Sequence, residues 1–408
     1  ANGSVVTWGD ARFGGNSSAV ASLLTEGVVQ VCGNNNVFAA IKANGSVVIW
    51  GMFIFGGDSS AVAALLTEGV VQVCGNKNAF AATKANSSVV TWGSPESGGN
   101  SSAVASLLTE GVVQVCGNNN AFAAIKANGS VVTWGIPESG GDSSAVAALL
   151  TDGVVQICSN FHAFAAIKAN GRVVTWGSYV FGGNSSAVAA LLTEGVVQIC
   201  GNSRAFAAIK ANGSVVTWGS PESGGNSSAV AALLTEGVVQ VCGNNNGFAA
   251  IRENGSVVTW GGNSLADAAV VALLTEGVVQ ICWNDNAFAA IKANGSIVTW
   301  GSPESGGNSS AVAALLTEGV VQVCGNNNAF AAIKANSSVV TWGDPESGGN
   351  SLAVAALLTD DIVQIFGSNN AFAAIKANGC VVTWGDPEHG GNSSAVASLL
   401  AEGVVQVC

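Results

Sequence analysis

The sequence predicts a mainly β fold, built as a tandem array of about ten 42-residue units with one short helix per unit. The string Ala-Asn-Gly-Ser-Val-Val-Thr-Trp-Gly opens the chain and returns in near copies along its whole length. Each copy alternates short apolar runs with Asn- and Gly-rich segments, a pattern typical of short strands joined by turns. Residues 1–408 are therefore expected to form a single repeat array, whose units begin at residues 1, 43, 85, 127, 169, 211, 253, 293, 335 and 377.

The helix of each unit is predicted from a Ser-rich start and a Gly-terminated apolar segment. In the first unit Ser17 is placed to cap the helix, and Gly27 is placed just after its end. Asp267 replaces the capping serine in the seventh unit, which is 40 residues long. Helical spacing puts three apolar side chains on one buried face, namely those of Val20, Leu23 and Leu24.

Three strands are predicted after the first helix, over residues 28–32, 38–42 and 46–50, the last of which lies at the start of the second copy. Asn44-Gly45 lies between the last two, and Asn-Gly between apolar strands is a strong signal for a tight hairpin. The strands are apolar on both faces. Each small sheet is therefore expected to lie between neighbouring sheets, which bury a core that one unit cannot build alone.

The order of these segments resembles the regulator of chromosome condensation repeat. The fourth unit is the most similar, with Val154-Val155-Gln156-Ile157-Cys158 and an Asn/His loop ahead of Trp176-Gly177. A closer likeness is to long HERC-like repeat arrays of unicellular algae, which also carry the Gly-Gly-Asn-Ser-Ser-Ala-Val segment. The resemblance implies a β-propeller-like array that contacts protein partners. Family rings usually have seven blades. The sequence, with nearly ten units, is therefore compatible with both a closed ring and an open superhelix.

Both ends of the chain fall inside the repeat. Ala1 begins at a hairpin turn, and the tenth unit stops at Cys408 after 32 residues. We therefore expect the 408 residues to be a segment of a longer chain or assembly.

Cysteine and tryptophan recur at fixed strand positions. Cys32 and eight equivalents share one position, and the ninth unit has Phe366 there, which indicates an apolar packing slot rather than a metal or disulfide ladder. Equivalent positions on stacked sheets lie about 10 Å apart, too far for a disulfide. A Trp ends the third strand of every unit. A light-sensing role would need neighbouring Arg residues, so packing is the favoured interpretation.

Charged residues form two ladders. An acid, such as Glu110, ends each helix, and a base, such as Lys126, ends each middle strand. We predict that the ladders pair within or between units, with two solvated rows as the alternative.

Composition argues against several function classes. The chain carries a net charge of −12 and only 9% charged residues, which disfavours nucleic-acid binding, and no apolar run is long enough to span a membrane. Two histidines lie in different units without a nucleophile motif, and no phosphate-binding glycine pattern occurs. We therefore predict no enzyme activity, catalytic residue, metal or cofactor.

Two loops vary between otherwise uniform units, and their aromatic and basic residues are the candidate partner contacts. One loop follows each Trp-Gly, and the other is the Asn loop between the first and second strands. Neutral drift between copies is the alternative interpretation. The candidates are Phe13, Phe53, Phe55, Phe161, His162, Tyr179, Phe181, Arg204 and Trp283.

The predicted function is a non-enzymatic repeat scaffold that offers a repeated surface to a protein partner or to itself. The alternative is a propeller adaptor for one partner, such as a small GTPase or a ubiquitination substrate, as the family resemblance implies. A surface for carbohydrate or ice is a third class, which the Asn loops permit. Unpaired cysteines favour an intracellular location, while many Asn-x-Ser sequons leave secretion open.

Overall fold

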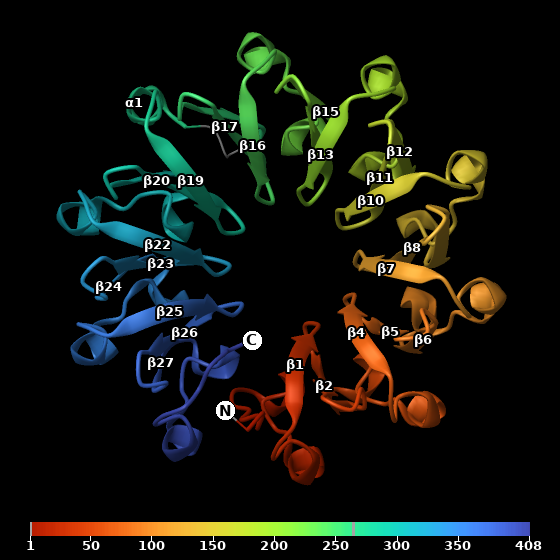
Figure 1. Ribbon diagram of the computed structural model, residues 1–408. Helices are drawn as coiled ribbons and strands as arrows, with labels where there is room; N and C mark the ends of the chain where they lie inside the picture. The colour runs from red at the N-terminus through yellow and green to blue at the C-terminus, as the bar shows by residue number, and fades with distance from the viewer. Residues whose placement is uncertain (1, 263–265) are drawn as a thin grey trace.

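The computed structural model describes residues 2–262 and 266–408. Three-stranded antiparallel sheets follow one another around a closed ring, with the short helices on the outer rim and the two ends of the chain side by side (Figure 1). The predicted mainly β, propeller-like array of about ten units is confirmed, and of the two arrangements the chain adopts the closed ring.

Each complete unit contributes three consecutive strands. The first strands are β1 (Val28–Gly33), β4 (Val70–Gly75), β7 (Val112–Gly117), β10 (Val154–Ser159), β13 (Val196–Gly201), β16 (Val238–Gly243), β19 (Val278–Trp283), β22 (Val320–Gly325) and β25 (Ile362–Gly367). The middle strands are β2 (Val37–Lys42), β5 (Ala79–Lys84), β8 (Ala121–Lys126), β11 (Ala163–Lys168), β14 (Ala205–Lys210), β17 (Phe248–Arg252), β20 (Ala287–Lys292), β23 (Ala329–Lys334) and β26 (Ala371–Lys376). The third strands are β3 (Val47–Gly51), β6 (Val89–Gly93), β9 (Val131–Gly135), β12 (Val173–Gly177), β15 (Val215–Gly219), β18 (Val257–Trp260), β21 (Ile297–Gly301), β24 (Val339–Gly343) and β27 (Val381–Gly385).

The middle strand pairs with both neighbours, and the predicted hairpin joins it to the third strand. In the first unit Lys42 N donates to Ser46 O, and Gly45 sits in the turn with a φ of +76°. This left-handed conformation suits glycine, which explains the Asn-Gly signal. The predicted strands at 28–32, 38–42 and 46–50 agree with β1, β2 and β3 to within a residue.

The core lies between consecutive sheets, as predicted. Ala121, Ala123 and Ile125 on one face of β8 pack against Phe164 and Ala166 on the facing side of β11, and equivalent clusters follow around the ring. Small Ala side chains on one sheet accommodate a Phe from the next. The first strands depart from the prediction, because Val29 and Gln30 of β1 are exposed beside a bulge.

The helices correct part of the prediction. Nearly all are single 3₁₀ segments, namely η2 (Ser18–Leu23), η4 (Ser60–Leu65), η6 (Ser102–Leu107), η8 (Ser144–Leu149), η10 (Ser186–Leu191), η12 (Ser228–Leu233), η15 (Ser310–Leu315), η17 (Leu352–Leu357) and η19 (Ser394–Leu399). Ser17 does not cap η2, because its hydroxyl pairs with Thr7 Oγ1 at 2.9 Å. Asn16 Oδ1 accepts from Ser18 N instead.

The helix face was also predicted wrongly. Leu24 is 2% exposed, but Leu23 is 50% exposed, because η2 ends at Leu23 and the backbone turns there. Gly27 does have a positive φ, but it lies four residues after the helix end at Leu23 and shapes the turn into β1. The seventh unit confirms the Asp267 cap: its carboxylate accepts from Val270 N, and the helix that follows is α1 (Ala268–Leu273).

Short 3₁₀ or π turns follow nine of the Trp-Gly pairs in the described residues. They are η1 (Ala11–Phe13), η3 (Phe53–Phe55), η5 (Pro95–Gly99), η7 (Pro137–Ser139), η9 (Tyr179–Phe181), η11 (Pro221–Ser223), η14 (Pro303–Ser305), η16 (Pro345–Gly349) and η18 (Pro387–His389). None of the helices in the described ranges is long and apolar enough to cross a membrane.

Candidate functional site

In most of the described units the two variable loops are joined on one side of the sheet. Asn160 shows how: its Oδ1 accepts from His162 N and Ala163 N, while its Nδ2 donates to Phe181 O at 2.5 Å. Asn76 makes the equivalent bond to Ser97 O. The buried Asn therefore holds the Asn loop against the turn that follows Trp-Gly, so residues that vary in either loop are brought together.

Three candidate contacts, His162, Phe181 and Arg204, form an aromatic cluster in the fourth and fifth units, and the exposed candidates Phe161 and Tyr179 lie in the same loops as His162 and Phe181. The His162 ring meets the edge of Phe181 at 4.6 Å, and the Arg204 guanidinium lies 5.7 Å from the Phe181 ring centre. Phe181 is half-buried against the core below, whereas Tyr179 is 75% and Phe161 43% exposed. Phe181 is therefore fixed by packing on the core, while the neighbouring Tyr179 and Phe161 side chains are exposed to solvent.

His162 lies at the polar side of this cluster. Its Nδ1 is 3.0 Å from Ser139 Oγ and 3.3 Å from Asn120 Nδ2 of the preceding unit. Burial, together with the positive charges of Lys77 and Arg204, lowers the pKa of His162 below its usual value. At neutral pH the ring is therefore uncharged, which favours a contact role over an ionic one.

The remaining candidates lie in other units. Phe13 is exposed and stacks on His389 at 6.1 Å, and Phe53 is exposed on its turn. Phe55 is half-buried and packs into the core between the first two sheets. Trp283 is exposed at the end of β19. The structure therefore brings His162 and Arg204 into contact with Phe181, keeps Phe161 and Tyr179 in the same loops, and leaves the other four predicted contacts in other units.

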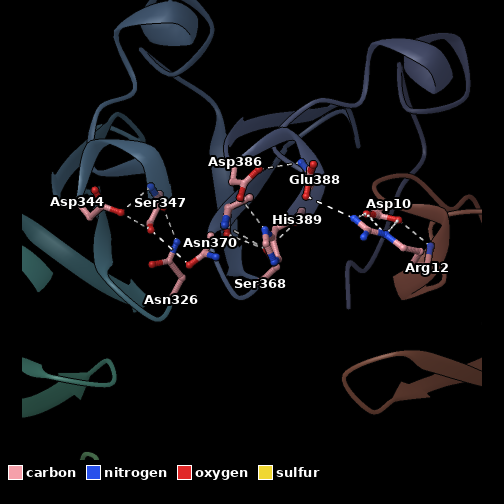
Figure 2. A network of polar contacts seen from close by, with 11 residues as sticks. Asp10, Arg12, Asn326, Asp344, Ser347, Ser368, Asn370, Asp386, Glu388 and His389 are labelled. Carbon is pink, nitrogen blue, oxygen red and sulfur yellow. Dashed lines mark hydrogen bonds and ion pairs between the residues drawn. The ribbon is translucent and has the colours of Figure 1, made fainter. Parts of the chain in front are cut away.

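A polar network at the junction of the two chain ends was not predicted. Arg12 donates to Asp10 and lies 3.7 Å from Glu388, while His389 Nδ1 is 2.7 Å from Asp386 Oδ2 (Figure 2). The hydrogen bond from Arg12 is the main cause that lowers the pKa of Asp10. Arg12 and His389 both replace residues of the common Pro-Glu-Ser turn. This departure from the repeat is visible in the sequence and could have drawn attention to the network.

The cysteines carry free thiols and form no disulfide. Cys242 and Cys282 are buried, most of the others are half-buried, and Cys408 is exposed. Burial raises the pKa of the Cys74 and Cys200 thiols to about 12. Within the residues described, no three His, Cys, Asp or Glu side chains are grouped to hold a metal ion.

Nine tryptophans make the same cross-unit bond. Trp134 stacks on Phe122 of its own sheet at 5.3 Å, and its Nε1 donates to Gly98 O of the preceding unit at 3.0 Å. The predicted packing role is therefore confirmed. The residues that make the bond are Trp8, Trp50, Trp92, Trp134, Trp176, Trp218, Trp260, Trp342 and Trp384.

The charge ladders pair at only two places in the described chain. Lys168 reaches Asp152 at 3.0 Å and Lys376 reaches Asp360 at 3.3 Å, both being units in which Asp replaces Glu. Lys126, by contrast, contacts the backbone and not an acidic side chain. Its Nζ donates to the carbonyl of Leu107 at the helix end, at 2.9 Å. The prediction of general pairing is therefore wrong, because the lysine neutralises the helix end itself.

Comparison with known proteins gives no family for this chain. No family model and no curated protein matches the chain. Similar solved structures include human WBSCR16 (16% identity, TM-score 0.37, covering 69% of this chain and 81% of that one) and Prp20p from Saccharomyces cerevisiae (13%, 0.36, 73% and 80%). The CRINKLY WD40 ectodomain of the Arabidopsis thaliana receptor kinase ACR4 is 15% identical, with a TM-score of 0.34 and coverage of 65% and 90%.

Proposed function

We propose that this chain is a non-enzymatic, ring-shaped interaction module that binds a protein partner through the aromatic cluster. The observation that carries the proposal is the meeting of three variable loops at one place on the ring, where side chains from two of them contact an aromatic ring on the third. Here His162 and Arg204, from two separate loops, both contact the half-buried ring of Phe181, which lies on a third.

The composition of the cluster supports a protein partner. Exposed aromatic and Arg side chains dominate the energy of protein interfaces when a rigid framework holds them. The cluster rests on the sheets of two units, and His162 and Arg204 both contact Phe181 before any partner arrives. The net charge of −12 supports a protein rather than a nucleic acid as partner.

A loop exchange tests this proposal without disturbing the fold. Tyr179-Val180-Phe181 is replaced by Pro-Glu-Ser, the sequence of the next unit's turn at Pro221–Ser223, which has the same 3₁₀ form. Peptides selected from a random library on the parent chain are expected to lose at least about ten-fold in affinity on the exchanged chain. The control exchanges Pro303-Glu304-Ser305 for Tyr-Val-Phe and should leave affinity unchanged. Equal affinity for all three chains would contradict the proposal.

A second function, the multivalent scaffold, is favoured by a repeated apolar rim. One Val near the start of each first strand and one Leu at the helix end are exposed in nearly every unit, for example Val113 and Leu107. Exposed apolar rows of this kind suit repeated contacts. Self-association that persists in the loop-exchanged chain and is lost on replacing several rim valines by Thr would select this function. Binding of a single partner molecule per ring would instead favour the function proposed for the aromatic cluster.

A further inference from the structure

Positive charge is rare on this ring outside the row of bases that ends the middle strands. Each of the nine middle strands ends in one of the 13 Lys and Arg residues. Of the remaining bases, Arg12 is paired with Asp10, and Arg172 lies in the connection between β11 and β12. The last two bases, Lys77 and Arg204, both lie in Asn loops, between β4 and β5 and between β13 and β14.

Lys77 and Arg204 both act on the aromatic cluster. The Arg204 guanidinium lies 5.7 Å from the centre of the Phe181 ring, and the ring of His162 lies against the same phenylalanine. Burial is the main cause that lowers the pKa of His162, and the two charges that lower it further, those of Lys77 and Arg204, are both positive. The cluster is therefore a positive spot on a chain whose net charge is −12.

Neither positive charge is neutralised by an acid in the part of the chain that the structure describes. Lys77 and Arg204 are exposed, and no ion pair joins either of them to a described residue. The turn η9 beside them carries Val180 where the common turn has an acid, as at Glu222 of η11. The acid of the preceding unit's turn, Glu138, is exposed on η7. Two positive charges therefore face solvent at the cluster, where a negatively charged partner can reach them.

The backbone of Arg204 is held in place, while its side chain is exposed. Arg204 N donates to Asn202 Oδ1 at 3.0 Å, and Arg204 O accepts from Ser220 N at 3.0 Å. Most other units have Asn at this position, and these amides can bond across units, as Asn246 Nδ2 does to Asn286 Oδ1 at 2.9 Å. A guanidinium that rests on an aromatic ring keeps the N–H groups of its edge for a carboxylate. The arginine thus replaces a neutral amide with an exposed positive charge.

We propose that the aromatic cluster binds an acidic peptide segment, whose Asp and Glu carboxylates meet Arg204 and Lys77 and whose aromatic side chain packs beside Tyr179 and Phe161. Charge-assisted hydrogen bonds between a guanidinium and a carboxylate are strong and directional. Tyr179 is 75% and Phe161 43% exposed, so both offer apolar surface to a partner's aromatic ring. This inference rests on the function proposed above, because it names the chemistry of the partner for the same site.

Single-stranded nucleic acid also combines negative charge with rings that stack on aromatic side chains. The net charge of −12 repels such a long polyanion, whereas a short acidic peptide can lie within the positive spot. The peptide is therefore the favoured partner, and the experiment below distinguishes the two.

Three fluorescein-labelled peptides test the charge and aromatic requirements on the unaltered 408-residue chain. The acidic peptide is Asp-Glu-Asp-Phe-Glu-Asp, its neutral counterpart is Asn-Gln-Asn-Phe-Gln-Asn, and the third peptide replaces the Phe of the acidic one by Ser. Anisotropy titrations should show the acidic peptide binding at least about ten-fold more tightly than either control. Its affinity should fall as sodium chloride is raised, because salt screens exposed charges. Tighter binding of a labelled short oligothymidylate would overturn the proposal in favour of nucleic acid.

Variants that restore the common loop residue locate the binding without disturbing the fold. Arg204→Asn and Lys77→Asn each install the residue that most units carry at that position, as at Asn246 and Asn245. Arg204→Asn should weaken the acidic peptide by at least about ten-fold, and Lys77→Asn should weaken it several-fold. Arg204→Lys should retain part of the affinity. The control Arg172→Ser removes the same charge beyond the other end of β11, where most units have Ser, and should leave the affinity unchanged.

The outcomes separate this inference from the proposed function. Equal binding of the acidic and neutral peptides, both lost in the loop-exchanged chain, would keep the aromatic cluster as a binding site and overturn the acidic partner. Acidic-peptide binding that neither Asn variant weakens would also overturn it. If none of the three peptides binds, the acidic partner is wrong, while the library selection still tests the cluster itself.

Discussion

At the residue scale, each unit depends on a few side chains that the neighbouring unit completes. Phe122 stacks on Trp134 within one sheet, and Trp134 bonds to Gly98 of the previous unit. Asn118 ties its loop to Ser139 O at 2.6 Å. The sequence identified the Trp, Cys and Asn positions by recurrence. It could not identify Ser17 as a partner of Thr7, because a serine before an apolar segment looks the same whether it caps a helix or bonds to a strand.

Removing a stacked phenylalanine tests the packing between units. Phe122→Ala should lower the free energy of unfolding by about 3 to 5 kcal/mol, because the side chain is fully buried between two sheets. The matched variant is Phe38→Ala, where the ring is only half-buried, and it should cost clearly less. Urea denaturation of both variants measures the difference. Equal losses would contradict the dependence of stability on burial between the sheets.

The buried thiols make the fold sensitive to alkali. Burial raises the pKa of Cys74, Cys158 and Cys200 to about 12, whereas unfolded thiols keep a value near 9. The folded chain therefore holds these protons more tightly, so their contribution is fully present below pH 9 and is lost as the pH rises toward 12. Unfolding free energies between pH 8 and 11 should fall, and a triple Cys→Ala variant should flatten the slope. A parallel decline in both chains would contradict this cause.

At the element scale, strands were predicted better than helices. A strand pair joined by Asn-Gly is specified by its own turn, so β2 and β3 could be placed from sequence. A six-residue helix is too short to show periodicity, and its 3₁₀ form left Leu23 exposed where α-helical spacing predicted burial. The charges at the helix ends were misjudged for a related reason, because Lys126 is attracted to the helix-end carbonyl of Leu107 more than to Glu110.

A double-mutant cycle separates the two kinds of helix end. Asp152 and Lys168 should couple by about 0.2 to 1 kcal/mol, as expected for an exposed ion pair 3.0 Å apart. Glu110 and Lys126 should show no coupling beyond error, since no ion pair joins them in the structure. The unfolding free energies of the single and double Ala variants give both values. Strong coupling at Glu110 would restore the ladder interpretation.

At the scale of the whole molecule, closure was the feature that sequence could not determine. Repeats fix which faces pack, but the rotation from one unit to the next depends on small differences in how Ala and Phe side chains fit between sheets. Ten such rotations sum to a closed ring in which Trp8 meets Gly390 (Figure 1). The aromatic cluster was only partly predictable for the same reason, because the contact of Arg204 with Phe181 depends on neighbouring units being adjacent at a fixed angle.

Electron microscopy of the purified 408-residue chain tests the account most directly. The structure predicts a compact closed ring of three-stranded sheets in which the two ends of the chain lie side by side. An open curved rod would contradict the closure.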